Sequence, residues 1–162
     1  MDRLLFVLTF LSALGGGLIG GLFFAFSSFV MTALGRLPPA SGISAMQSIN
    51  DAVLNPVFFP AFFGTAVLSV LALIAALIRW SEPATGYLLA GSLLYLVGTI
   101  LVTIVCNVPL NNRLAAVRAD GAEGASLWKR YLSTWTAWNH VRTVTSIAAA
   151  ASFIMALVRQ AS

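Results

Sequence analysis

Few side chains in this 162-residue chain could take part in chemistry, and most of them lie near the ends of apolar segments. A single histidine, His140, and a single cysteine, Cys106, provide neither a catalytic triad nor the ligands of a zinc or iron–sulfur site. Cys106 also has no partner for an intrachain disulfide. The other candidates are a carboxylate, a guanidinium and several amides: Gln47, Asn50, Asp51, Asn55, Asn107, Asn111, Asn112, Asn139 and Arg142.

The composition places these residues in a membrane protein. Hydrophobic residues make up 59% of the chain and charged residues 9%, with a mean hydropathy of +0.93. Soluble domains carry roughly 25% charged residues, and one of this size buries only about two-thirds of its unfolded surface. The surplus apolar surface must therefore face lipid. The net charge is +4, and the basic residues are scattered without forming a run. Membrane topology and anionic lipid therefore explain the positive charge better than nucleic acid does.

Four apolar segments are long enough to span a bilayer. We place them at about 4–34, 57–78, 86–106 and 138–158. The first segment is too long for the apolar part of a signal peptide. Shorter helices are expected at 41–55 and beyond residue 107, and residues 126–158 follow the spacing of one long helix. The sequence thus predicts an all-α fold, an integral membrane four-helix bundle in a single domain over 1–162, with short juxtamembrane helices on one side.

An even number of spans puts both termini on the same side of the membrane, called side A here. The opposite side, side B, holds the segments 36–55 and 107–135 and six of the nine Lys and Arg residues. The positive-inside rule would make side B cytoplasmic and leave the termini outside. The preference for Arg over Lys, with abundant Ala and Gly, favours a bacterial inner membrane.

The alternating direction of the helices collects the polar candidates at the side-B end. Ionisable and amide groups at membrane depth must face the bundle interior or water, and they are functional candidates by default. Trp135, Trp138, Asn139 and Arg142 follow one helical stripe, whereas His140 lies roughly 100° around the helix from Asn139. We therefore expect a polar pocket open toward side B, walled by aromatic residues of spans one, two and four.

Each candidate also has a purely structural explanation. Arg142 can extend its charge to the interface, and Asp51 can pair with Arg142 or Arg36. The tryptophans suit an interfacial belt, although Trp138 is the best candidate for a pocket wall, and His140 suits the interface too. The amides can act as helix caps, Asn55 for the second span and Asn107 and Asn111 for the end of the third.

The first span also contains two pairs of glycines at a spacing of four, Gly16/Gly20 and Gly17/Gly21. Small residues at this spacing allow another helix to approach closely. They favour helix packing within the bundle, and the same face could hold a homo-oligomer together.

Several short stretches resemble the anthrone oxygenase-like family of small membrane proteins. In the first half these are Phe23-Phe24-Ala25-Phe26-Ser27 through Leu34, Met46-Gln47-Ser48-Ile49-Asn50 and Asn55-Pro56. In the second half they are Asn107-Val108-Pro109-Leu110-Asn111 and Trp138-Asn139-His140-Val141-Arg142-Thr143. The motifs occur in the family's order and cover most of the chain. The resemblance implies a four-helix membrane protein, and Gln47, Asn50, Asn107, Asn111, Asn139 and Arg142 are its matching polar positions.

The resemblance further implies oxidation of an anthrone by molecular oxygen without a conventional cofactor. An anthrone has an acidic methylene whose anion reacts with oxygen, so a site needs an aromatic slot, a base and donors for an oxyanion. Asp51 or His140 would then be the base. Arg142 and the asparagines would hold the oxyanion, with Arg142 as a catalytic group and with Gln47, Asn50, Asn107, Asn111, Trp138 and Asn139 binding the substrate.

Two other classes of function remain open on the sequence. The same pocket could bind or transport a lipophilic small molecule without chemistry, although no inverted repeat is present. Alternatively, the protein could be an accessory subunit that packs against a larger membrane complex. A polar cluster at one depth is not required of such a subunit and therefore counts against it.

Overall fold

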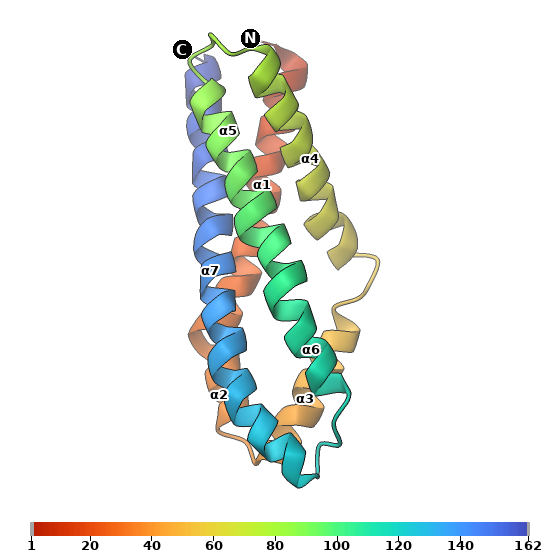
Figure 1. Ribbon diagram of the computed structural model, residues 1–162. Coiled ribbons are helices and arrows are strands. Elements are labelled where there is room, and N and C mark those ends of the chain that lie inside the picture. The colour runs from red at the N-terminus through yellow and green to blue at the C-terminus, as the bar shows by residue number, and fades with distance from the viewer. Residues whose placement is uncertain (1, 162) are drawn as a thin grey trace.

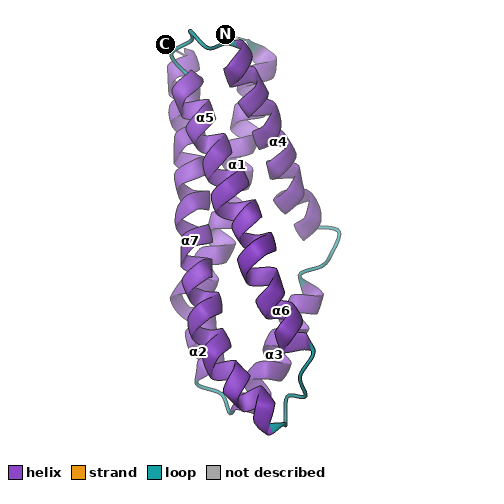
Figure 2. Cartoon of the chain, in the orientation of Figure 1, coloured by secondary structure: helices purple, strands orange, loops and turns teal. Residues whose placement is uncertain are grey.

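The computed structural model describes residues 2–161, and no strand occurs in that range. Figure 1 shows long helical rods side by side, and Figure 2 shows loops only where helices are connected. The rods comprise Arg3–Gly35, Phe58–Ile78, Thr85–Ala115 and Ala122–Ala161, and each is long and apolar enough to cross a membrane. The predicted all-α architecture with four candidate spans is confirmed.

The rods consist of the following elements. The first contains α1 (Arg3–Ala25), the π-helical turn η1 (Phe26–Val30) and α2 (Met31–Gly35). The second is α4 (Phe58–Ile78), and the fourth is α7 (Ala122–Ala161). The third contains α5 (Thr85–Leu93), the π-helical η2 (Leu94–Leu101) and η3 (Thr103–Asn107), and α6 (Val108–Ala115). The short helix α3 (Pro39–Ala52) packs against α2, α6 and α7.

Local chemistry explains where these helices begin. The Asp2 carboxylate accepts hydrogen bonds from the amides of Leu4 and Leu5, at 3.0 and 3.4 Å, and so caps α1. Pro39 is the first residue of α3, where its missing N–H group costs nothing. The Asn55 side chain accepts bonds from two amides at the start of α4, both at 2.9 Å. The capping role expected for Asn55 is therefore present.

The third rod differs from the sequence-based expectation, because it does not end near residue 106. The helix continues through Pro109 to Ala115. Pro109 lies in the first turn of α6, directly after η3. The wider π-helical turn shifts the hydrogen-bond register there, so the missing proline N–H does not end the helix.

The bundle is longer than a membrane is thick. The 40 residues of α7 extend about 60 Å, whereas the hydrocarbon layer measures about 30 Å. Two hydrophobic cores share this length. One, between α1, α4, α5 and α7, includes Ile19, Leu88, Tyr95 and Phe153. The other belongs to the α2, α3 and α6 end of the molecule and consists of Met31, Leu34, Ile43, Met46, Leu114, Trp128, Tyr131 and Trp135.

The two glycine pairs of α1 have different surroundings. A Cβ atom at Gly20 would lie 2.9 Å from Ile147 of α7, and Gly16 lies against Ala150 of the same helix. Nothing lies within 4 Å of such an atom at Gly17 or Gly21. The first pair thus brings α1 and α7 together, which leaves only the second pair for the predicted homo-oligomer.

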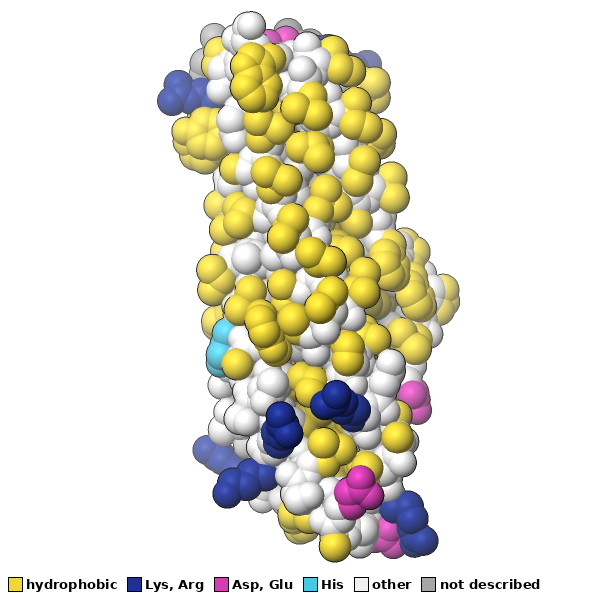
Figure 3. Space-filling model, in the orientation of Figure 1, with side chains coloured by type: hydrophobic (Ala, Val, Ile, Leu, Met, Phe, Trp, Pro, Cys, Tyr) yellow, Lys and Arg dark blue, Asp and Glu magenta, His cyan; other side chains and the backbone are white. Residues whose placement is uncertain are grey.

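The surface is apolar over most of its length. Figure 3 shows hydrophobic side chains along the face of the bundle and several Lys and Arg side chains toward the end formed by α2, α3 and α6. Both termini lie at the opposite end, together with the α4–α5 connection (Figure 1). The end with both termini is therefore side A, and the end formed by α2, α3 and α6 is side B.

Candidate functional site

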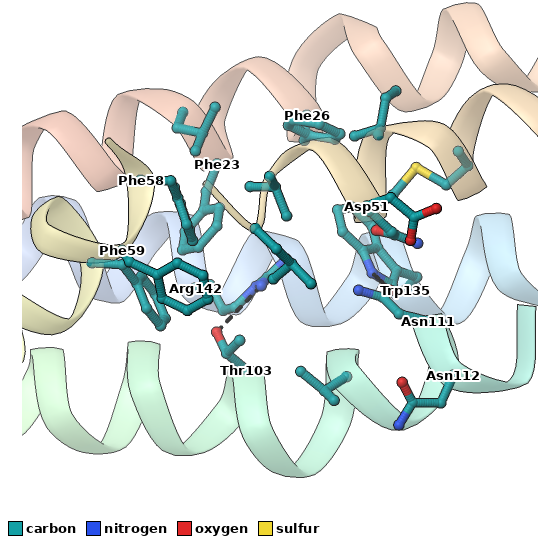
Figure 4. A pocket seen from close by; sticks show the side chains of 18 of the residues that line it. Phe23, Phe26, Asp51, Phe58, Phe59, Thr103, Asn111, Asn112, Trp135 and Arg142 are labelled. Carbon is teal, nitrogen blue, oxygen red and sulfur yellow. Dashed lines mark hydrogen bonds between the residues drawn. The ribbon is translucent and has the colours of Figure 1, made fainter. Parts of the chain in front are cut away.

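A cavity of about 290 Å³ lies where the two hydrophobic cores meet. Its apolar wall is built mainly from phenyl rings of α1, η1 and α4: Phe23, Phe26, Phe58, Phe59, Phe62 and Phe63. Its polar groups come from α3, η3, α6 and α7: Asn50, Asp51, Thr103, Asn111, Asn112 and Arg142. Figure 4 shows that side chains from all these elements surround one space. These polar groups lie among aromatic rings of the first, second and fourth rods, and most of the lining is apolar.

Arg142 is the charged group buried most deeply in this cavity. Its side chain comes from α7, and the residue is 4% exposed. It lies 16 residues before Val158, or about 24 Å along the helix, and so within the expected hydrocarbon layer. One terminal nitrogen donates to Thr103 Oγ1 at 3.2 Å and the other to Asn139 Oδ1 at 2.7 Å. Arg142 is therefore fixed inside the bundle and does not extend to the interface.

Within residues 2–161 this guanidinium has no carboxylate partner. Its carbon lies 4.1 Å from the centre of the Phe23 ring and 5.1 Å from the centre of the Trp135 ring, so π faces replace a counter-ion. Its Nε is buried without a hydrogen-bond partner. A buried cation without a counter-ion costs several kcal/mol. The charge thus favours any anion that enters the cavity.

Asn139 holds the Arg142 side chain in place. Its Nδ2 donates to the Phe23 carbonyl and to Ser27 Oγ, both at 2.8 Å, and its Oδ1 accepts from Arg142. Asn139 is fully buried, and it does not line the cavity. It connects η1 and α1 with α7 and orients the guanidinium, so its position fits support of Arg142 better than direct contact with a substrate.

Asp51 and Asn111 both line the cavity, as Asn50 does. The ion pair with Arg142 or Arg36 that the sequence left open for Asp51 does not occur, and Asp51 is free of ion pairs within the described chain. Asn111 Oδ1 accepts hydrogen bonds from the Tyr131 hydroxyl and from Trp135 Nε1, both at 2.8 Å. Asn111 therefore connects α6 with α7 rather than capping a helix end.

Two other candidates act as links between helices. Gln47 Nε2 donates to the carbonyls of Leu114 and Val117, at 2.9 and 3.1 Å, and so attaches α3 to the end of α6. Asn107 is buried, and its Nδ2 donates to the Trp135 carbonyl at 3.2 Å. Neither side chain lines the cavity. The cap expected for Asn107 is also absent, because the helix continues beyond it.

His140 and Trp138 lie outside this cavity. Both are exposed on the outer face of α7, and neither lines the cavity. Helix geometry explains why Trp135, and not Trp138, faces the cavity. Trp135 precedes Arg142 by two turns on the buried stripe of α7, whereas Trp138 is displaced from that stripe. Trp135 is thus the tryptophan of the pocket wall. Thr103 was missed by the sequence reasoning, although it lies four residues before Asn107 and so on the same helix face.

Comparison with known proteins identifies the family. The sequence model of the family described as anthrone oxygenase matches residues 56–152, which is more than half of the chain. This range contains Asn107, Asn111, Asn139 and Arg142, whereas the first-half stretches up to Asn55 precede it. Neither a curated protein nor a solved structure gives a significant match. The chain belongs to the anthrone oxygenase family.

Proposed function

We propose that this protein is a membrane oxygenase that converts a lipophilic aromatic substrate of the anthrone type, which has an acidic methylene, in the cavity around Arg142. The single observation that carries this proposal is a buried guanidinium, without a carboxylate partner, in a cavity with phenyl walls. A planar aromatic molecule suits the walls, and an enolate oxygen suits the charge. The family assignment supports the same chemistry.

The reaction follows from these groups. A base removes one proton from the methylene of the substrate, and the negative charge moves onto the carbonyl oxygen beside Arg142. The carbanion carbon forms a bond with molecular oxygen, which takes up the electron pair and, with a proton, gives a hydroperoxide. Loss of the second hydrogen from that carbon and cleavage of the O–O bond release water and leave a carbonyl group. One oxygen molecule thus turns a methylene into a quinone carbonyl and one water.

Asp51 is the proposed base. Among the cavity-lining residues it is the one side chain that is both acidic and free of an ion pair. Figure 4 shows Asp51 on the same side of the cavity as Asn111 and Trp135, with Arg142 beside Phe58 and Phe59. A substrate that spans the cavity would present its methylene to Asp51 and its oxygen to Arg142. His140 is not part of this proposal, because it faces outward.

The substrate is proposed to arrive from the bilayer. Leu54, Phe59, Phe63 and Val108 line the cavity and are each at least 39% exposed. An apolar aromatic compound dissolved in lipid would therefore reach the cavity between α4 and α6 without crossing water. This route fits an enzyme whose substrate concentrates in membranes.

The test is oxygen consumption by the purified protein in lipid nanodiscs with anthrone as the probe. We expect anthraquinone and water in equal amounts, faster than in protein-free nanodiscs. Arg142→Gln and Asp51→Asn should lower the rate at least tenfold, whereas Arg113→Gln, a change at an exposed arginine of α6, and His140→Ala should not. Binding of anthraquinone without oxygen consumption would overturn the enzymatic proposal and leave a binding protein.

A further inference from the structure

The orientation of the Asn111 amide is fixed by two neighbouring donors. Trp135 Nε1 and the Tyr131 hydroxyl both lie 2.8 Å from the same Asn111 atom. An indole N–H can only donate, so the atom that faces it must be the amide oxygen. This removes the usual ambiguity between the oxygen and the nitrogen of an asparagine side chain. The NH₂ group must therefore point away from both rings.

The two donors are themselves held rigidly. Trp128, Tyr131 and Trp135 stack along α7 with ring centres 5.6 and 5.9 Å apart. All three are buried in the core at the side-B end, and Trp135 also lies 5.7 Å from Phe26. A stack within a packed core has little freedom to turn. The direction of the Asn111 amide is thus set before any substrate binds.

The NH₂ group of Asn111 has no acceptor among residues 2–161, although Asn111 lines the cavity together with Arg142. Figure 4 shows the Asn111 side chain extending from α6 beside Trp135 toward the space that Arg142 also borders. An uncharged donor from one helix and a charged donor from another therefore face one cavity. Donors that are oriented in advance need no reorganisation when charge develops on an oxygen.

We infer that Asn111 Nδ2 is the second donor of an oxyanion site with Arg142, and that Tyr131 and Trp135 are positioning residues that keep this nitrogen turned inward. The inference rests on the proposed function, because it assigns a donor for the enolate oxygen of that reaction. Asn111 is then a catalytic residue that contacts substrate. Tyr131 acts only through it, whereas Trp135 also lines the cavity and lies against Arg142.

The simpler view is that Asn111 is a helix link, as Asn107 is. Asn107 donates to the Trp135 carbonyl and does not line the cavity. The two residues lie four positions apart on the same rod and contact the same tryptophan. Asn107→Ala is therefore a matched control, since it removes a link of the same kind but no donor in the cavity.

The experiment measures kcat and KM for anthrone oxidation in nanodiscs, together with thermal unfolding. Asn111→Ala should lower kcat roughly hundredfold, as expected for loss of one oxyanion donor, with KM changed less than about threefold. Asn107→Ala should lower the unfolding temperature with kcat within about twofold of the wild-type value. Tyr131→Phe, which removes one donor to the Asn111 oxygen and lets the amide turn, should lower kcat by roughly tenfold with little change in KM.

The outcomes separate the inference from the function on which it depends. If Asn111→Ala keeps the wild-type kcat while Arg142→Gln loses it, the oxyanion role of Asn111 is wrong and the proposed function stands. If Arg142→Gln keeps the wild-type kcat as well, the proposed function itself fails. Should Asn111→Ala not fold, Tyr131→Phe decides, because a wild-type kcat in that variant contradicts the positioning role.

Discussion

Replacement of Arg142 by methionine should lower activity without lowering stability. Methionine has a similar length and no charge, so the variant removes a buried cation that has no carboxylate partner. Burial of such a charge costs several kcal/mol, which the variant recovers. Against this gain, Asn139 Oδ1 loses its donor, at a cost of about 1–3 kcal/mol. Thr103 keeps its own hydrogen bond to the Thr99 carbonyl. The unfolding temperature should therefore stay unchanged or rise.

The activity of Arg142→Met should fall. Removal of one preorganised donor to a developing oxyanion costs about 10²–10³ in kcat, or about 2.7–4 kcal/mol. The kcat of Arg142→Lys should lie between that of the wild type and that of Arg142→Met. An ammonium keeps the charge but lacks the planar fork that reaches Thr103 and Asn139 together. Anthraquinone formation in nanodiscs gives the rate, and circular dichroism of the helices gives the unfolding temperature.

Two results would refute this reasoning. Wild-type turnover in Arg142→Met would show that the cavity does not use the charge. A fall in activity that merely follows a fall in unfolding temperature would show that Arg142 serves the fold alone. Arg113→Met is the matched control, since Arg113 is exposed on α6 and outside the cavity. Both its stability and its turnover should stay at the wild-type level.

Three predictions concern the bundle itself. Gly98→Ala should lower the unfolding free energy by about 1–3 kcal/mol, because a Cβ atom there would collide with the Thr145 side chain. Gly64→Ala should be neutral or stabilising, since its Cβ meets nothing within 4 Å, and thermal unfolding compares the two variants. Gln47→Ala should speed hydrogen exchange at the end of α6, where two carbonyls lose their donor, and a rate unchanged there would contradict the link. Backbone amides of the first helical turn and the charge of Arg79 hold the pKa of the Asp2 carboxyl below its ordinary value of 3.8. Its stabilisation is therefore present above that pH and lost as the pH falls below it, so Asp2→Asn should show a weaker decline in unfolding temperature on acidification, and equal declines would refute the assignment.

The burial of Arg142 without a carboxylate partner is informative in itself. A chain selected only for packing would place an apolar side chain at that position, since lipid and protein interior both exclude an unpaired charge. The surrounding sequence instead supplies Thr103, Asn139 and two π faces to hold it. Violations of local rules of this kind are expected at functional sites. This is why the cavity, and not the glycine faces, is the place to look for activity.

The sequence by itself determined the four candidate spans and the end of the bundle at which most polar residues gather. Span length and apolar composition decide whether a helix crosses a bilayer, and alternating direction decides which ends meet, so both follow from the order of residues. Helical spacing likewise placed Asn139 and Arg142 on one buried stripe. Even the position of Asn55 as a cap followed from its place before the second span.

Only the tertiary structure decided which of these residues share the cavity. Two tryptophans of α7 precede Arg142, Trp135 by about two turns and Trp138 by about one. The packing of α1 and α6 against α7 places Trp135 in the cavity wall and leaves Trp138 outside. The continuation of the third rod past Pro109 brings Asn111 to Tyr131 and Trp135, a result that depends on the π-helical turn. Such contacts depend on rotation about helix axes and on hydrogen-bond partners distant in sequence. The sequence therefore gathered the candidates at one level, and packing divided them into cavity walls, helix links and lipid-facing side chains.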